Sequence, residues 1–365
     1  MRVMFYLADM GGSGRARAAL AAAAGLAARG HSMLIACCDG SQLEQRARDA
    51  QLETIVINRP ASVSGSTLDL RRLLREREVD VVIVGTEREQ LIVSSAMRLA
   101  GRGAVLRRVP PFTGLTLHRG GRLAVRIARS GILVTSQREL QDLDAGGWPI
   151  PPAVVPIGID TSSYDDVSTI TREALDVPLS GVLIACSYDV SGRYQIPVMF
   201  RTLALLATRR VRVHVIVLGP ASDDDELRMH ASALGVGHLV TFLGDRADHL
   251  SVMRAADVGW VVSSGDAGAF ACLDFMALRQ PVIAPRSPLT QHYVADGITG
   301  VLLSSTDPSY TASDIAAFLS APERREAMGN AARARAQREF SESLMLDGFE
   351  HAVTAAGDRT AWTTK

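Results

Sequence analysis

Two aspartates frame a run of small residues in the second half of the chain. Asp266 and Asp274 stand eight positions apart, and apolar residues at helical spacing follow the first of them. This spacing predicts a helix from about Gly268 to Arg279, with Asp266 in the turn before it and Asp274 about a turn inside. The first amides of a helix lack partners within it and bind anions, and small side chains let a phosphate approach them. The amides expected to meet such an anion are those of Ala267, Gly268, Ala269 and Phe270.

Polar residues also follow two expected strands in the first half of the chain. Glu87 and Arg88 come after the strand Val81–Val84, and Arg108 lies in the loop that runs to His118 after the next strand. Ligands of open α/β sheets bind beyond the carboxyl ends of the strands. These two loops are therefore candidate binding sites. His118 is either a base or hydroxyl ligand there, or an ordinary surface histidine.

A regular alternation of strands and helices positions these residues. Strands are expected at Val3–Leu7, Met33–Ala36, Thr54–Ile57, Val81–Val84, Ala104–Arg107, Ile132–Val134 and Val182–Cys186, and further strands follow to Val301. Helical patterns lie between them and end with Pro322–Glu339 and about Ser341–Ala355. This rhythm predicts an α/β fold with parallel sheets covered on both faces. The length of 365 residues suits two domains, and Pro149–Pro152 punctuates the end of the first.

Composition excludes several classes of protein. Acidic and basic residues balance at 39 each, which implies no general attraction to nucleic acid. The only lysine is Lys365, so neither a Walker lysine nor a pyridoxal-binding lysine is available. The four cysteines lack metal-ligand or redox spacing, and Asp223–Asp225 suits a helix N-terminus. We therefore expect no metal, no cofactor, and buried thiols in a reducing compartment.

The stretch around the two aspartates resembles the signature of family 4 glycosyltransferases of the GT-B fold. Leu273–Ala277 and Pro281–Ala284 are similar to the second half of that signature. Asp266 and Asp274 stand where the family has two glutamates. Val154–Asp160 is similar to the Pro-Asn-Gly-Val-Asp turn that joins the two domains in this family. The resemblance is strong from this turn onward and weak before it.

This resemblance implies a fold and a division of the chain. It predicts two doubly wound, Rossmann-like α/β domains that face a cleft. The first, over 1–160, is implied to be the acceptor side and to be completed by the terminal helix, about 341–365, which crosses back to it. The second, over 161–340, is implied to bind the nucleotide-sugar donor.

The resemblance also implies roles for single residues at the donor side. The donor is implied to be a nucleotide-diphosphate sugar, such as a UDP- or GDP-sugar, bound without metal. Asp266 would orient the donor sugar and Arg193 would stabilise the leaving diphosphate, so these two are the expected catalytic residues. Asp274 would bind the ribose diol, because a carboxylate accepts two hydroxyls well. The other implied donor-binding residues are Gly12, Arg15, Ser187, Gly244, Ala267, Gly268, Ala269 and Phe270.

On the acceptor side, the implied candidates are Glu87, Arg88, Arg108 and His118. The implied reaction is hexosyl transfer, with retention of anomeric configuration, to a glycan, lipid or small-molecule acceptor. For Arg15 the alternative is a surface arginine near a helix N-terminus.

The chain departs from the family pattern in two ways, which keep other functions open. Both acids are aspartate, which is shorter than glutamate, and Ser187 stands where the family usually has an arginine. One cation of an expected pair is thus missing. One alternative is a catalytically degenerate GT-B protein that binds nucleotide or glycan without turnover. A third is another enzyme on the same fold, such as a nucleotide-sugar epimerase.

A basic stretch bears on where the protein acts. Arginines recur at helical spacing beside apolar residues, at Arg119, Arg122, Arg126 and Arg129. Such a face either contacts anionic lipid or is simply solvated. We expect a cytoplasmic protein, with peripheral contact at the inner membrane face through Arg119–Arg129 if this face binds lipid.

Overall fold

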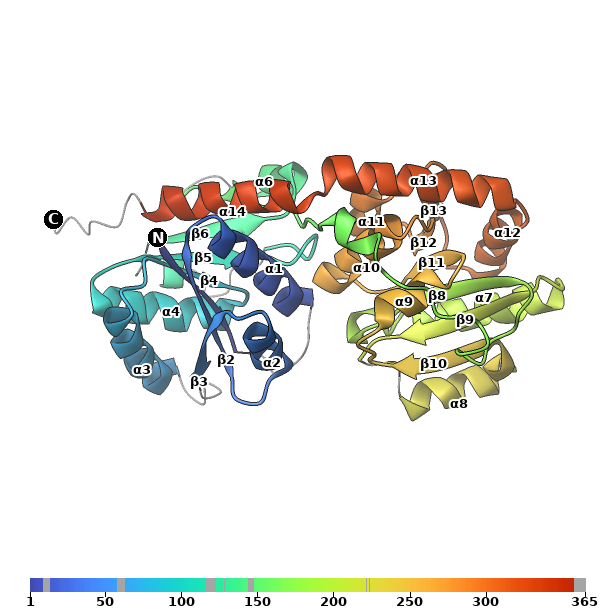
Figure 1. The fold of residues 1–365 in the computed structure, drawn as a ribbon, viewed down its shortest axis with the longest axis horizontal. Coiled ribbons are helices and arrows are strands. Elements are labelled where there is room, and N and C mark those ends of the chain that lie inside the picture. Colours follow the sequence, from blue (N-terminus) through green and yellow to red (C-terminus); the bar gives the residue numbers. More distant parts are fainter. Residues whose placement is uncertain are drawn as a thin grey trace. The chain divides into compact units, whose positions relative to one another are not determined.

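The computed structural model describes residues 1–8, 14–57, 63–115, 123–125, 127, 129–143, 148–220, 222 and 224–357. The chain divides into two compact units (Figure 1): unit 1 comprises Met1–Gly158 with Glu342–Lys365, and unit 2 comprises Ile159–Ser341. Each unit has a parallel sheet covered by helices, so the predicted α/β class with two Rossmann-like units is confirmed. Predictions for Gly12, His118, Arg119, Arg122 and Arg126 fall outside the described residues.

The sheet of unit 1 has the strand order β3-β2-β1-β4-β5-β6-β7, and every described pairing in it is parallel. Its strands are β1 (Arg2–Leu7), β2 (Ser32–Cys38), β3 (Glu53–Ile57), β4 (Val81–Val84), β5 (Ala104–Arg108), β6 (Ser130–Val134) and β7 (Ala153–Val154). Its helices are α1 (Gly14–Ala28), α2 (Gln42–Asp49), α3 (Val63–Glu76), α4 (Glu87–Ala100), α6 (Gln137–Asp142) and α14 (Glu342–Gly357).

The residues of β1 alternate between two hydrophobic cores, as side chains of a strand covered on both faces must. Phe5 faces the core shared with α1 and α14, and Tyr6 faces the core shared with α3 and α4. The ring of Phe349, on α14, meets the ring of Phe5 edge-on with centroids 5.9 Å apart. A Cβ atom on Gly25 of α1 would lie 2.4 Å from Leu346, so α14 crosses α1 closely. The helix that follows unit 2 in sequence thus completes the core of unit 1.

The sheet of unit 2 has the order β10-β9-β8-β11-β12-β13, again with parallel pairings. Its strands are β8 (Val182–Ser187), β9 (Val213–Leu218), β10 (Val240–Gly244), β11 (Val258–Val261), β12 (Val282–Pro285) and β13 (Gly300–Leu303). Its helices are α7 (Ile196–Thr208), α8 (Asp225–Ala233), α9 (His249–Arg254), α10 (Gly265–Ala277), α11 (Pro288–Tyr293), α12 (Pro308–Leu319) and α13 (Pro322–Glu339). Three 3-10 turns complete it: η1 (Thr161–Tyr164), η2 (Val190–Gly192) and η3 (Gly237–Leu239).

Helix α10 is the central helix of unit 2. From Gly268 to Ala277 all of its residues are buried, which explains why its sequence is apolar on every side. It approaches β11 closely, because a Cβ atom on Gly259 would lie 2.2 Å from the ring of Phe275.

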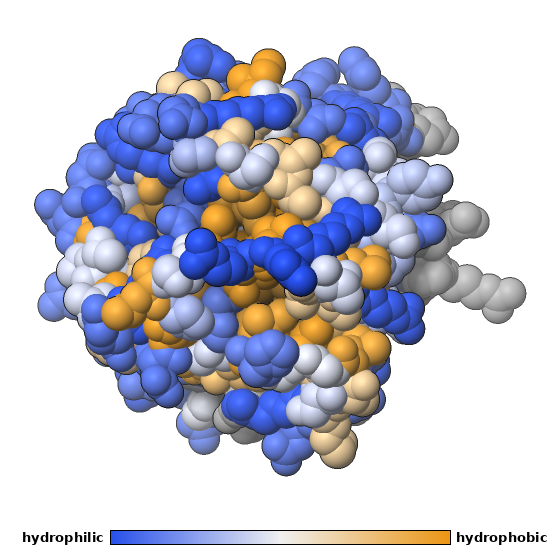
Figure 2. Space-filling model, turned by 90° about the vertical axis from the view of Figure 1, so that its right-hand side faces the viewer, coloured by the Kyte–Doolittle hydropathy of each residue, from blue (hydrophilic) through white to orange (hydrophobic). Residues whose placement is uncertain are grey.

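Elsewhere on unit 2, one outer face carries hydrophobic side chains in its middle and hydrophilic ones around them (Figure 2).

The chain enters and leaves unit 2 at neighbouring points. The amide of Ile159 donates to the carbonyl of Phe340 at 3.0 Å, and Ile159 forms a parallel bridge with Ser341. None of the described helices combines the length and the apolar character that crossing a bilayer requires.

A buried histidine in β9 predicts that unit 2 loses stability in acid. His214 is 8% exposed and its Nε2 pairs with the hydroxyl of Thr241 at 2.8 Å. Burial, and then the nearby His238, lower the pKa of His214 below its ordinary value of 6.5. In acid, His214 therefore binds a proton more readily in the unfolded chain than in the folded one. The free energy of unfolding should fall as the pH drops below about 6.5. We expect His214→Gln to reduce the change in urea midpoint between pH 7 and pH 5, and the exposed His351→Gln to leave it unchanged. An equal pH dependence in both variants would contradict this assignment.

Candidate functional site

The order of the strands in unit 2 reverses at β8. From β8 the chain steps outward to β9 and β10, then returns to the other side of β8 with β11 and continues to β12 and β13. Strands β8 and β11 are parallel neighbours, so the loops that follow them meet at the same edge of the sheet. In open α/β sheets the crevice at such a reversal is where ligands bind. The loop after β8 carries Arg193, and the loop after β11 leads directly into α10, whose first turn carries Asp266; both residues are candidates from the sequence.

Hydrogen bonds join these two loops into one surface. The amide of Ser264, after β11, donates to the hydroxyl of Ser191, after β8, at 2.8 Å. The hydroxyl of Ser263 accepts the amide of Asp189 at 3.1 Å and donates to the carbonyl of Ser187 at 3.4 Å. Asp189 in turn caps η2, since its carboxylate accepts the amide of Ser191 at 3.0 Å. The turn before α10 is thus fixed to the loop that carries Arg193.

The neighbouring strand ends are tied in the same way. Gly219, after β9, has a φ of +121° that side chains rarely allow, and its amide donates to the carbonyl of Gly244 at 2.9 Å. A Cβ atom on Gly219 would lie 2.0 Å from the carbonyl oxygen of Tyr188. The carboxyl ends of β8, β9 and β10 therefore lie close together through backbone alone, and Gly244 is part of this edge.

Helix α10 begins earlier than its sequence predicted. It starts at Gly265, whose φ of +58° lets the chain turn directly from Ser264 into the helix. The amide of Gly268 already donates to the carbonyl of Ser264 at 3.1 Å. The amides of the following two residues continue this helical ladder. The expectation that Gly268, Ala269 and Phe270 present amides to an anion is therefore wrong, and the first-turn amides are those of Gly265, Asp266 and Ala267.

Both aspartates lie on α10, and both are buried. Asp266 was expected in a loop but occupies the first helical turn, where it is 5% exposed, while Asp274 is 4% exposed. Eight helical residues separate them by about 12 Å along the axis. Two aspartates at that separation are too far apart to act together on one reacting atom.

Two donor-site candidates, Arg193 and Ser187, lie at or after the end of β8 and have different surroundings. Arg193 follows η2, is exposed, and stacks over the ring of Tyr194 at 5.7 Å. Ser187 is the last residue of β8 and is half-buried, and its carbonyl is held by Ser263.

Unit 1 repeats the pattern of a strand-order reversal, here between β1 and β4. Glu89, in the first turn of α4, is 5% exposed and joins the two strand ends. Its carboxylate accepts the amide of Ala8 after β1 at 2.8 Å, and the amides of Gly85 and Thr86 after β4 at 3.0 and 2.8 Å. Thr86 closes a capping box with Glu89.

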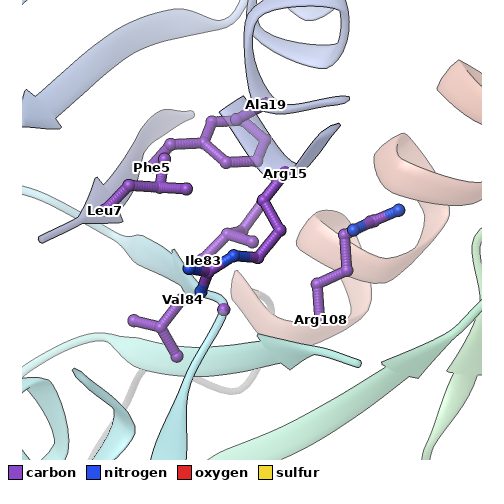
Figure 3. Close-up of a pocket in the computed structure, with 8 residues that line it drawn as sticks. Phe5, Leu7, Arg15, Ala19, Ile83, Val84 and Arg108 are labelled. Carbon is purple, nitrogen blue, oxygen red and sulfur yellow. The ribbon is translucent and has the colours of Figure 1, made fainter. Parts of the chain in front are cut away.

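A hollow of about 280 Å³, including space open to solvent, lies at this edge of unit 1. Arg15 and Arg108 line it together with apolar residues of β1 and β4. Arg15 reaches from the start of α1 over the end of β4, and a Cβ atom on Gly85 would lie 2.9 Å from its guanidinium (Figure 3). The side chain of Arg108 points away from the apolar residues (Figure 3). Two residues predicted for different roles, Arg15 and Arg108, are thus neighbours at one hollow.

The other candidates of unit 1 lie on α4. Glu87 is half-buried and lies 3.9 Å from Arg107, whose guanidinium also donates to Gln90 at 3.5 Å. Arg88 is exposed. Arg107 was not singled out from the sequence, because in a strand that reads Leu-Arg-Arg nothing distinguishes the two arginines.

Cysteine and metal chemistry are also constrained by the structure. The four cysteines are free and buried, and burial raises the pKa of the Cys37 thiol to about 11, which keeps it protonated and unreactive. Within the described ranges no group of three His, Cys, Asp or Glu side chains is arranged to hold a metal ion.

With this geometry in view, comparison with known proteins is informative. Residues 172–335, nearly all of unit 2, match the family model described as glycosyl transferases group 1. Unit 2 is therefore similar to the glycosyl transferases of group 1 over these residues. The group 1 match includes η2, α10 and both aspartates, and the predicted resemblance is confirmed.

Several curated relatives share one name. This chain is 29% identical over 210 residues to the D-inositol 3-phosphate glycosyltransferase of Segniliparus rotundus, and the match covers 56% of this chain and 46% of that one. It is 30% identical over 246 residues to that of Corynebacterium glutamicum, covering 63% and 54%. The chain spans about half the length of the curated relatives it matches.

Solved structures match almost the whole length of this chain. HepE of Anabaena, in complex with UDP and glucose, has a TM-score of 0.79 at 18% identity and covers 97% of this chain and 100% of that one. A glycosyltransferase of Rickettsia africae has a TM-score of 0.77 at 15% identity, covering 98% and 99%. At these identities the likeness shows the fold, which is the GT-B fold of two Rossmann-like domains.

Proposed function

We propose that the chain is a glycosyltransferase that moves a sugar from a nucleotide-diphosphate donor to an acceptor, with retention of anomeric configuration and without a metal ion. The observation that carries this proposal is the surface at the strand-order reversal of unit 2. There two hydrogen-bonded loops meet the N-terminus of α10, a helix that carries one buried aspartate in its first turn and a second about 12 Å further along its axis. A nucleotide sugar is long enough to use both.

In this proposal the residues of unit 2 divide the donor between them. The first-turn amides of α10 and the guanidinium of Arg193 stabilise the departing diphosphate. Asp266 orients the donor sugar, and Asp274 binds the ribose diol. Ser187 and Gly244 line the nucleotide site through the backbone of the sheet edge. The departing phosphate itself takes the proton of the acceptor hydroxyl, so no side chain need act as base.

Unit 1 is proposed as the acceptor side. The curated relatives are named for an inositol phosphate acceptor. Arg15 and Arg108 at the hollow of unit 1 would suit a phosphorylated small molecule, because guanidinium groups bind phosphate bidentately. Arg15 also remains a candidate for the donor phosphate. Glu87, Arg88 and His118 remain candidates for acceptor hydroxyls.

Glycan and lipid-linked acceptors remain within the proposal. We propose a cytoplasmic location, supported by the four free, buried thiols. If the acceptor is lipid-linked, we propose that the Arg119–Arg129 face contacts anionic lipid at the membrane. Binding to vesicles of phosphatidylserine that weakens as salt is raised would support this contact, because salt screens the attraction between arginine and anionic lipid.

A second candidate is a protein that binds nucleotide without turnover. One observation favours it: Ser187 stands where the family usually has an arginine and so supplies no cation for a diphosphate. The assay below separates the two candidates.

Replacing Asp266 with alanine should lower turnover about tenfold and leave nucleotide affinity unchanged, because its proposed partner is the reacting sugar. Release of nucleoside diphosphate is followed from a panel of UDP- and GDP-sugars with inositol phosphates as acceptors, with and without chelator. The matched control is Asp225→Ala, another first-turn acid, exposed on α8. Binding of nucleotide without release by the wild-type chain would establish the second candidate, and loss of activity with chelator would contradict a metal-free mechanism.

A further inference from the structure

Tyr164 lies far from Asp274 in the sequence but next to it in unit 2. It ends η1, the first turn after the chain enters unit 2, and is 4% exposed. Its hydroxyl donates a hydrogen bond of 2.5 Å to Oδ1 of Asp274. A bond this short between a phenol and a carboxylate is a charge-assisted one, the stronger class of hydrogen bond.

Arginines of two helices, α9 and α13, hold the segment around Tyr164. Arg254 of α9 donates to the carbonyl of Tyr164 at 2.7 Å. The carboxylate of the next residue, Asp165, accepts from Nη2 of Arg333 of α13, which lies 2.8 Å from each of its oxygens. Arg333 is 3% exposed and also donates to the carbonyl of Ala277, the last residue of α10. Tyr164 and α10 are therefore held by the same arginine.

This arrangement gives the hydroxyl of Tyr164 one orientation. A side chain whose backbone is already immobilised loses little further freedom when it forms a hydrogen bond, so the bond to Asp274 costs little entropy. An ionised carboxylate offers about four acceptor positions, and the phenol uses one of them. The bond to Tyr164 thus orients the carboxylate of Asp274.

Resting on the proposed function, we propose that Tyr164 is a positioning residue that sets the carboxylate of Asp274 for the ribose diol of the nucleotide. An aspartate is shorter than a glutamate, so its carboxylate has less reach from the helix and depends more on being aimed. The hydrogen bond from the phenol of Tyr164 supplies that orientation. A tie that merely attached η1 to α10 would affect stability but would not depend on the ribose.

The test uses the full chain and the ligands UDP and 2′-deoxy-UDP in titration calorimetry. The wild type should bind UDP about tenfold more tightly than 2′-deoxy-UDP, because one hydroxyl bond to a charged group is lost. Tyr164→Phe should lose most of this discrimination by weakening UDP about fivefold to tenfold while leaving 2′-deoxy-UDP nearly unchanged. The control is Tyr293→Phe, which removes an equally buried hydroxyl from α11.

A compensating variant distinguishes aim from simple contact. Tyr164→Phe combined with Asp274→Glu lengthens the acid as it removes the phenol oxygen, and it should regain at least half of the lost discrimination on a logarithmic scale. Retention of discrimination by Tyr164→Phe would overturn the proposal. So would equal weakening of both ligands with a lowered melting temperature, since that is the signature of a structural tie.

Failure of the proposed function is a separate outcome. If the wild type binds neither UDP nor GDP, the donor site itself is wrong. If the wild type binds UDP and discriminates while Tyr164→Phe behaves like it, only the role of Tyr164 is wrong.

Discussion

Replacing Glu89 with alanine is expected to lower the free energy of unfolding of unit 1 by about 3–5 kcal/mol. The buried carboxylate accepts three backbone amides, from Ala8, Gly85 and Thr86, and alanine leaves all three donors without it. Hydrogen bonds to charged groups contribute about 1.5–3 kcal/mol each, and they do not add fully in one cluster. The loss should also free the end of β1 from the end of β4.

The measurement is urea unfolding together with hydrogen exchange resolved by peptide, which separates the two units. Exchange should accelerate in β1 and β4 and stay unchanged in β8 and β11. Glu89→Gln should be intermediate, since its amide keeps one carbonyl oxygen but no charge. The control is Glu76→Ala, an acid 57% exposed that pairs with Arg72. A change in the free energy of unfolding in Glu89→Ala no larger than in this control would show that the carboxylate does not stabilise the ends of β1 and β4.

Replacing Gly268 with alanine is expected to disrupt the donor-site surface of unit 2. The added Cβ atom would lie 2.2 Å from the carbonyl oxygen of Ser263 and 2.8 Å from Leu289. The nearer obstacle is backbone, which cannot swing aside, so α10 or the turn before it must shift. Overpacking of this kind costs about 3 kcal/mol.

The functional effect should exceed the effect on stability. Ser263 and its neighbour Ser264 hold the loop after β8 through their hydrogen bonds, so a shift there displaces Arg193 and Asp266 together. A misplacement of about 1 Å lowers turnover on the order of a hundredfold. Gly237→Ala is the control, because the nearest atom to its Cβ is the flexible hydroxyl of Ser232 at 3.2 Å. Full activity in Gly268→Ala at a lowered melting temperature would separate this contact from the active site.

The strands and their order of appearance were predictable because burial on both faces leaves a plain mark in the sequence. Runs such as Val81–Val84 are apolar without a break, and the structure buries all four residues. The start of α10 was not predictable in the same way. It depends on Gly265 adopting a positive φ, a choice that local sequence permits but does not enforce.

Contacts between distant segments set the remaining limit on prediction. Nothing near Tyr164 in the sequence indicates that its hydroxyl meets Asp274, because 110 positions separate them. Glu89 differs: the pattern Thr86-x-x-Glu89 is a recognisable capping box, and its second role toward Ala8 follows only once β1 and β4 are adjacent. The sequence therefore indicates local hydrogen bonds such as a capping box, but it does not indicate which distant segment the same side chain contacts in the fold.

The position of α14 has a consequence for how the protein is made. Its residues Leu346 and Phe349 belong to the core of unit 1, yet the ribosome adds them only after the whole of Ile159–Ser341. At the usual rate of about 5–20 residues per second, that interval lasts about 10–40 s. Throughout it, the nascent first unit exposes the apolar groove of α1 that Leu346 later covers. Translation that stalls within unit 2 thus yields a chain with an open core, which chaperones and proteases recognise, whereas unit 2 can close as soon as it has emerged.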